Sequence, residues 1–324
     1  MDTTITDTAA HPVRPVESAP APLLADSVAL LGPTRWSRAT GSGGRSPAPP
    51  HGASAPVAPP GTWLTDTGWG DGDRAELRRV LNGRYDAYAR VVTRTLAEEP
   101  GLRATGKPAE LVPELVALCA YQAGERDPVN KALRTGVDDG MTIVARGALR
   151  GLRRLPAVLG PVFAAGGDVE AVINGYRAGE ELVEPAFVDV AISGSRSPGA
   201  SVEYVIWSVS AHQLSRFGSG SAVFAPGSRF AVLAVDPPAD GRGPLRVLLR
   251  DRAGDRPGRA AGDDRLLERL RGVLPRESAG RPPRHLGFTP GLDERGRRYA
   301  PPPRNGRTAE GYSSGGARGV GIAE

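Results

Sequence analysis

Three charged residues stand in contexts where they could take part in chemistry. Asp189 lies in the apolar run "PAFVDVAIS", where a carboxylate could stabilise a cation or bind a sugar hydroxyl. Arg134 in "NKALRTG" and Arg196 in "SGSRSPG" each carry a guanidinium that could grip a phosphate. Each residue also has a structural alternative. Asp189 would face solvent on an alternating strand, Arg134 would stabilise a helix C-terminus, and Arg196 would be solvated in its loop.

Other catalytic and metal chemistries have little support in the sequence. Cys119 is the single cysteine, so no intramolecular disulfide can form, and its run "LVALCAY" favours a buried apolar role. Only four dispersed histidines are present, and we therefore expect no metal site. The segment "GPVFAAGGD" resembles an anion site at a helix start, but Asp168 would repel phosphate there and is expected to cap the helix.

Composition divides the chain into three parts. Residues 1–60 are rich in Pro, Ala, Gly and Ser, and we expect them to be disordered. Residues 253–324 form a tail rich in Arg, Gly and Pro, and their fourteen Arg against nine Asp or Glu account for the net charge of +5. A helix is predicted at 262–274, either packed back on the domain or free to bind a partner. The ordered domain is expected at 61–252.

Within that domain, helical periodicity gives way to strands. Residues 61–157 predict a helical lobe, with one helix from Asp73 to Leu96 and another from Pro108 to Ala120. A shorter helix follows, with Asp127 as its N-cap and Gly136 as its stop. Residues 158–252 predict a β core of short strands rich in Val, Ile and aromatic residues. The fold class is therefore α+β.

The order of these elements resembles that of the arginine-type mono-ADP-ribosyltransferase family over roughly residues 80–250. The fragments that carry the resemblance are "VNKALRTG", "LRRLPAVLGPVFAAG", "YRAGEELVEPAFVDVAIS" and "VEYVIWSVSAHQLSRFGSGSAVFAPGSRFAVLAV". The last ends in a strand, a Pro-Gly turn and a second strand, similar to the family's closing hairpin. The resemblance implies an ADP-ribosyltransferase-like β-sandwich core that uses NAD as substrate.

The resemblance also implies three chemical groups, and this chain lacks all of them. The arginine that grips the dinucleotide falls on Ala164, with Ala165 beside it. The Ser-Thr-Ser strand falls on Asp189, Val190 and Ala191, and the Glu-x-Glu turn falls on Gly220, Ser221 and Ala222. The chain therefore looks like a divergent member of the family with its catalytic motifs replaced. Asp189 is the candidate catalytic residue, and Arg134 and Arg196 are the candidate cofactor-binding residues.

Three functions remain open from the sequence. The first is a catalytically degenerate protein that binds a protein partner and needs no cofactor. The second is an active NAD-dependent mono-ADP-ribosyltransferase with relocated residues that modifies protein side chains. The third is a scaffold or regulatory protein that acts through its tails. Nucleic acid is not indicated as a partner, because the arginines lack interleaved aromatics.

The sequence also suggests where the protein works. We find neither a secretory signal nor an apolar run of about 18 residues, so we expect a cytoplasmic protein without a membrane span. The composition is rich in Gly, Ala and Arg with almost no Lys, which is typical of a bacterial genome of high GC content.

Overall fold

The computed structural model describes most of the predicted domain and part of the predicted tail. The described residues are 55–59, 63–64, 69–194, 197, 199–214, 220–238, 241, 243–253, 263–273 and 285–301. Residues 1–54 and 302–324 lie outside these ranges, so the predicted disorder of these residues stays a prediction. No helix in these ranges combines the length and the hydropathy needed to cross a bilayer.

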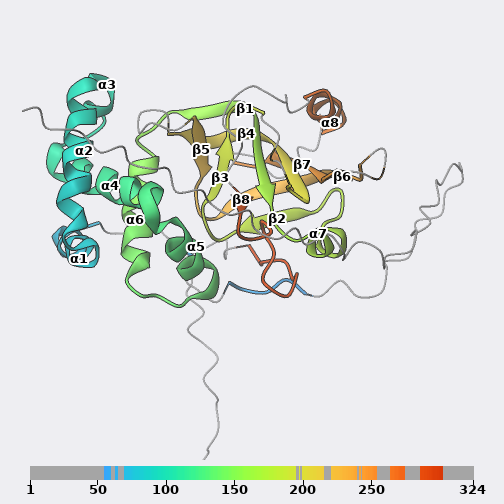
Figure 1. Cartoon of the computed structure of the whole chain (residues 1–324), viewed down its shortest axis with the longest axis horizontal. Coiled ribbons are helices and arrows are strands. Elements are labelled where there is room, and N and C mark those ends of the chain that lie inside the picture. Colours follow the sequence, from blue (N-terminus) through green and yellow to red (C-terminus); the bar gives the residue numbers. More distant parts are fainter. Residues whose placement is uncertain are drawn as a thin grey trace, which may run out of the picture. The chain divides into compact units, whose positions relative to one another are not determined.

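The fold is α+β, as the sequence predicted, with a group of helices followed by a strand-rich core (Figure 1). The helices of the first group are α1 Asp71–Leu81, α2 Arg84–Glu98, α3 Pro100–Arg103, α4 Pro108–Ala120, α5 Arg126–Thr135 and α6 Met141–Leu152. A π-helical turn, Tyr121–Glu125, joins α4 to α5, and α7 Val169–Gly175 and α8 Asp263–Arg271 belong to the second half. The helix α8 lies within the range 262–274 where the sequence predicted one.

Two helical predictions differ in detail from the structure. The helix expected from Asp73 to Leu96 is divided into α1 and α2, because Asn82 adopts a positive φ of 47° and Gly83 follows it. Asp127 lies inside the first turn of α5 and does not cap it, since Glu125 holds the N-cap position. The predicted stop is correct: Gly136 is left-handed, with φ 72°, and closes α5.

The strands are β1 Ala157–Gly166, β2 Glu181–Glu184, β3 Val188–Ala191, β4 Val202–Gln213, β5 Ser221–Phe224, β6 Ser228–Asp236, β7 Leu245–Asp251 and β8 His285–Leu286. Their order in the sheet is β2-β6-β7-β4-β5-β3-β1-β8. The strand β4 also pairs with β1 along almost its whole length, so β1, β3, β5 and β4 close on one another. The β5–β6 turn places Gly227 at φ 83°, which explains the Pro-Gly of the predicted hairpin.

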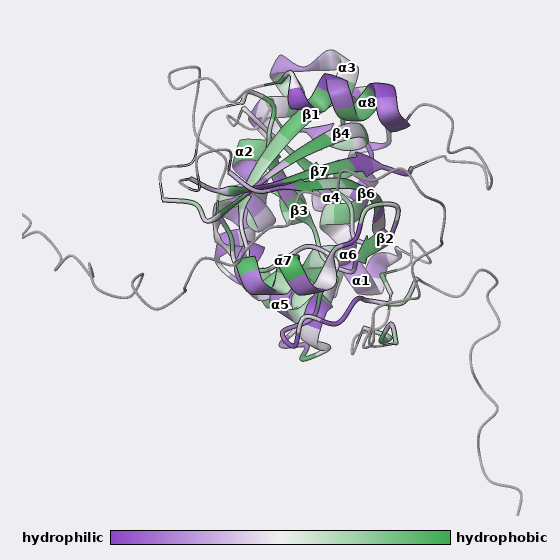
Figure 2. Cartoon of the chain, turned by 90° about the vertical axis from the view of Figure 1, so that its right-hand side faces the viewer, coloured by the Kyte–Doolittle hydropathy of each residue, from purple (hydrophilic) through white to green (hydrophobic). Residues whose placement is uncertain are grey.

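Alternation along the strands sorts the side chains into two faces. The inner face forms one apolar core, in which Val162, Val188, Phe224 and Ile206 meet. On the outer face of the sheet, Val223 of β5 and Phe187, which directly precedes β3, pack on the helical group. The outer face of β4 and β7 is covered by α8 through Leu270, and in Figure 2 these strands are predominantly hydrophobic while α8 carries hydrophilic residues.

The end of the described chain differs from the expected tail. Residues 285–300, here called the C-terminal strap, begin with β8, which pairs in parallel with the end of β1. Leu286, Leu292 and Tyr299 are buried, and Val57 bridges to Tyr299. These residues therefore belong to the domain, although their composition resembles that of the tail around them.

Candidate functional site

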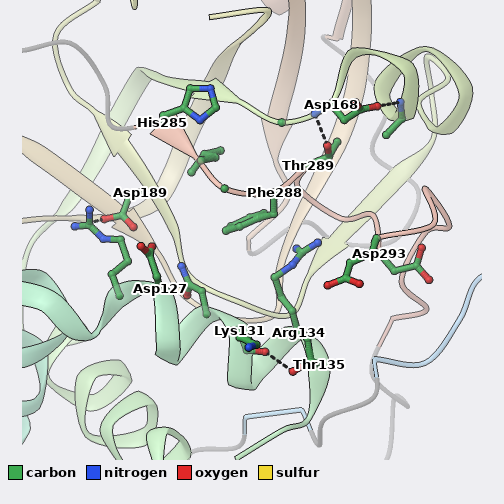
Figure 3. A pocket seen from close by; sticks show the side chains of 17 residues that line it. Asp127, Lys131, Arg134, Thr135, Asp168, Asp189, His285, Phe288, Thr289 and Asp293 are labelled. Carbon is green, nitrogen blue, oxygen red and sulfur yellow. Dashed lines mark hydrogen bonds and ion pairs between the residues drawn. The ribbon is translucent and has the colours of Figure 1, made fainter. Parts of the chain in front are cut away.

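A pocket of about 640 Å³ lies between α5, the end of β1 and the C-terminal strap. The helix α5 contributes one wall through Arg126, Asp127, Asn130, Lys131, Arg134 and Thr135. The opposite wall comes from the β1–α7 turn, with Gly167 and Asp168, and from the strap, whose Phe288 projects between the two walls (Figure 3). Asp189 lines one end of the pocket.

Asp189 is buried, and the expectation that it faces solvent is wrong. Its side chain lies on the outer face of β3, which is the face that the helical group covers. The hydroxyl of Tyr121 donates a hydrogen bond to Oδ2 at 2.7 Å, and Arg126 Nη2 lies 2.9 Å from Oδ1. Burial, and then the nearby Asp189 charge, raise the pKa of Tyr121, so the hydroxyl keeps its proton. The carboxylate therefore links the helical group to the sheet.

Arg134 lines the same pocket and is also paired. Its Nη1 donates to both carboxylate oxygens of Glu184 at 2.7 Å, and its Nη2 donates to the carbonyl oxygen of Leu292. The Phe288 ring lies 4.3 Å from the guanidinium carbon. Burial disfavours the charge, but Glu184 together with Tyr299 and Tyr176 outweighs this effect, and the pKa of Arg134 is raised. These contacts give Arg134 a structural role, but they run to Glu184 and Leu292 and not to the C-terminus of α5, where the sequence analysis placed it.

Glu184 is the residue of this site that the sequence analysis missed. It ends β2, is fully buried, and also accepts hydrogen bonds from the backbone amides of Ala186 and Gly291. Its segment "EELVEPAF" gave one signal, an acidic residue directly before an apolar strand. The partner itself could not be identified, because Arg134 lies 50 residues earlier in the chain.

The positions assigned to the family's chemical groups fall on both faces of the sheet. Ala164, Val190 and Ala222 lie in the inner apolar core, each no more than 2% exposed. Their neighbours Ala165, Ala191 and Ser221 occupy the opposite face by alternation. The position of the family's arginine holds Ala164, with Ala165 beside it, and carries no guanidinium. The position of the family's last glutamate holds Ala222 and carries no carboxylate. Gly220 precedes β5 and accepts a hydrogen bond from the Ile192 amide, and Arg196 lies outside the described residues.

Carboxylates outnumber cations among the side chains that line the pocket. Five carboxylate side chains line it against three cationic ones: Asp127, Asp168, Asp189, Asp293 and Glu294 against Arg126, Lys131 and Arg134. Arg126 and Arg134 already have a carboxylate partner, and two of the carboxylates, Asp189 and Asp293, are paired with Arg126 and Arg297. Asp168 caps α7 by accepting from the Ala171 amide at 2.6 Å, as the sequence predicted. Among the described residues, no group of three or more His, Cys, Asp or Glu could hold a metal ion.

Solved structures with a similar fold come from bacterial effectors and toxins. The type III effector XopAI from Xanthomonas axonopodis pv. citri aligns over 56% of this chain and 84% of its own, with 17% identity and a TM-score of 0.49. The ADP-ribosyltransferase HopU1 of Pseudomonas syringae pv. Tomato DC3000 aligns over 56% and 98%, with 17% identity and a TM-score of 0.48. This chain is similar in structure to bacterial ADP-ribosyltransferases.

Exoenzyme S from Pseudomonas aeruginosa, whose structure holds human 14-3-3 protein beta and Carba-NAD, aligns over 61% of this chain and all of its own. The identity is 18% and the TM-score 0.40. No family model and no curated protein matches the sequence. These ADP-ribosyltransferase likenesses are too distant to carry a conclusion about activity, ligand or target.

Proposed function

We propose that this protein is a catalytically degenerate ADP-ribosyltransferase-like protein that acts by binding a protein partner. One observation carries the proposal. The positions assigned to the family's arginine and glutamate hold Ala164 and Ala222, and both side chains lie in an apolar core. The candidate replacements, Asp189 and Arg134, already have buried partners of opposite charge.

The physical cost of these losses is large. Cleaving the bond between nicotinamide and ribose develops positive charge on the sugar, as glycoside hydrolysis does. Removing one preorganised electrostatic stabiliser typically costs about 3 kcal/mol, or about a hundredfold in rate. Asp189 could supply such a charge only by giving up Arg126, which would leave that buried guanidinium without its carboxylate.

Binding of a protein surface fits the rim of the pocket better than binding of a dinucleotide. Asp127, Lys131, Asp168 and Glu294 are exposed there and can form ion pairs with a partner. The excess of carboxylates opposes the diphosphate of NAD, because like charges repel most strongly where water is partly excluded. The same excess favours a partner with a basic surface.

The test is to incubate the purified full-length protein with NAD labelled on its ribose and adenine, and to follow both hydrolysis and transfer to protein. We expect neither, and we expect no heat of binding when NAD is titrated into the protein. Hydrolysis or transfer that Asp189→Asn abolishes, and that the exposed control Asp86→Asn does not, would overturn the proposal.

One observation favours the second candidate, an active transferase with relocated residues. Asp189 and Arg134 line the same open pocket, so a carboxylate and a guanidinium do converge on one cavity. For this candidate, NAD binding must displace the Arg126–Asp189 ion pair, because Asp189 is its catalytic carboxylate. Protection of Arg126 from an arginine-modifying reagent would then fall when NAD is added. Unchanged protection at saturating NAD speaks against this candidate.

A further inference from the structure

An exposed apolar surface lies at the start of β1, at the opposite end of this strand from the pocket. Leu159 is 78% exposed there, and Val209 on β4 is 37% exposed. Both lie on the outer face of the sheet, because alternation along each strand places them on the same side as Phe163 and Val205, which belong to the cluster beneath α8. Two half-buried side chains of this face, which are register partners, adjoin them. We call this surface the outer apolar patch, and its members are Leu159, Pro161, Trp207 and Val209.

A β-bulge fixes the most exposed part of the patch. The register between β1 and β4 shifts at Leu159, which lies opposite two residues of β4, Val209 and Ser210. The Oδ2 atom of Asp251, at the end of β7, accepts hydrogen bonds from the Val209 and Ser210 amides at 2.9 and 2.8 Å and from the Ser210 hydroxyl at 2.7 Å. Asp251 is 2% exposed, so a buried carboxylate holds the bulge in place. The exposure of Leu159 and Val209 is therefore set by the fold of the sheet and is not fraying of its end.

The flank of α8 beside the patch is positively charged. The helix packs over β4, β6 and β7 (Figure 2), and the guanidinium carbon of Arg269 lies 4.6 Å from the centroid of the Trp207 ring. Arg265 lies one turn earlier on the same flank, and both arginines are exposed. Within the described ranges neither of them forms an ion pair with a carboxylate, whereas Arg271 on the opposite flank pairs with Asp236 at 3.0 Å. The patch is thus bordered by two guanidinium groups whose charge no described side chain neutralises.

We propose that the outer apolar patch is a docking surface for a protein segment that carries aliphatic side chains next to carboxylates. In the complex, the aliphatic side chains cover Leu159 and Val209 and remove their apolar area from water. The carboxylates pair with Arg265 and Arg269, and such pairs at the rim set the orientation and the choice of partner more than the affinity. This inference concerns a surface apart from the pocket, so it stands whether or not the pocket binds a partner or NAD.

Charge and composition distinguish this occupant from the alternatives. A second copy of the chain, docked patch to patch about a two-fold axis, brings a second positive flank to the same rim. Residues 254–262 and 274–284, which flank α8 in the sequence, hold five Arg against two Asp or Glu and so repeat the sign of the rim. A bilayer surface is bound through exposed Trp or Tyr side chains, but Trp207 is half-buried beneath Arg269. An acidic and aliphatic segment complements both the apolar surface and its charge.

Peptides selected from a displayed random library on the full-length protein serve as probes of this surface. We expect enriched sequences that combine Leu, Ile or Val with Asp or Glu, and a synthetic peptide of this kind should bind Leu159→Lys at least about tenfold more weakly than the wild type. The control Val91→Lys should bind the peptide as the wild type does, because Val91 on α2 is also aliphatic and 51% exposed. Both variants should keep the wild-type thermal midpoint, since neither side chain is buried. A selection in which every enriched peptide binds Leu159→Lys as tightly as the wild type would overturn the proposal.

A pair of double variants tests the role of the α8 arginines. Arg265→Glu with Arg269→Glu should weaken binding of the same peptide about tenfold at low salt and make its affinity less sensitive to added salt. Arg90→Glu with Arg94→Glu makes the same change of charge at the same spacing on α2, where both arginines are exposed, and should leave the affinity unchanged. Equal losses in the two double variants would show an effect of net charge alone and contradict the proposal.

Two measurements on the full-length protein test the other occupants. In sedimentation we expect no dimer that Leu159→Lys dissociates, and in flotation with vesicles of phosphatidylcholine and phosphatidylserine we expect no binding that depends on Leu159. A dimer or a vesicle-bound form that is lost in Leu159→Lys and kept in Val91→Lys would assign the patch to a second copy or to a membrane, and the proposal would then be wrong.

Discussion

At the scale of single residues, Asp189 shows that a charged side chain can line a pocket and still serve the fold. Its two oxygens are engaged by Tyr121, at the start of the π-helical turn between α4 and α5, and by Arg126, at the start of α5. Arg134 repeats the arrangement with Glu184. Both pairs connect the helical group to the strands, so their charges are used within the molecule. The contribution of each pair to the free energy of unfolding can therefore be measured.

Asp189→Asn should destabilise the protein by about 3 kcal/mol, because it leaves the largely buried Arg126 without a countercharge while keeping an acceptor for Tyr121. Urea unfolding followed by circular dichroism gives the value. The double variant Arg126→Leu, Asp189→Asn should recover a large part of the loss, because no unpaired charge is left. A single variant as stable as the wild type would show that the pair contributes nothing to the fold.

At the scale of elements, the packing of α4 on α6 depends on two glycines. A Cβ atom at Gly151 would lie 2.5 Å from the Glu114 carbonyl oxygen, and one at Gly147 would lie 2.6 Å from Ala117 Cβ. Gly151→Ala should therefore destabilise the protein by about 1–3 kcal/mol, although alanine favours the helix. Gly72→Ala in α1, where nothing lies within 4 Å, should stabilise it by up to about 1 kcal/mol. Urea midpoints of the two variants that shift in the same direction would refute this account of the α4–α6 contact.

The buried tyrosine of the C-terminal strap predicts a loss of stability at alkaline pH. Burial raises the pKa of Tyr299 to about 12 from its usual value near 10. The stabilisation from its protonated form is therefore complete below pH 10 and is lost as pH rises towards 12. Between pH 10 and pH 11, the wild type should lose about 1 kcal/mol more than Tyr299→Phe. Parallel stability curves for the two proteins over this interval would contradict the prediction.

The sequence predicted the elements that local signals determine. Hydrophobic periodicity placed α4 at Pro108–Ala120, and Asp168 and Gly136 marked a helix start and a helix end correctly. The C-terminal strap had no comparable signal, because β8 is two residues long and its partner β1 lies about 120 residues earlier in the chain. The direction of Asp189 also depended on a contact that local sequence cannot show, namely the helical group on the outer face of β3.

At the scale of the whole molecule, the described core is built in layers, and the residues that form it lie between 64 and 299 in the sequence. The helical group lies on β3 and β5, the inner apolar core follows, and α8 covers β4 and β7. Of the positions that the family resemblance assigned to catalysis, Ala164, Val190 and Ala222 lie within these layers, whereas Asp189 lines the pocket at their edge. A scaffold can therefore keep its packing while the chemistry of its site changes, because the site contributes little to the core.

The same organisation predicts where partner binding lies. A chain of residues 55–301 contains every side chain of the three apolar clusters and the C-terminal strap. Its thermal midpoint should agree with that of the full chain within about 2 °C, since no described core contact is lost. If binding belongs to the domain, a partner captured by the full chain will bind this shortened chain with the same affinity, and Asp127→Lys or Asp168→Lys at the pocket rim will weaken it. Loss of the partner from a shortened chain that keeps its midpoint would instead assign binding to residues 1–54 or 302–324, which are parts of the two tails that the tail hypothesis invokes, 1–60 and 253–324.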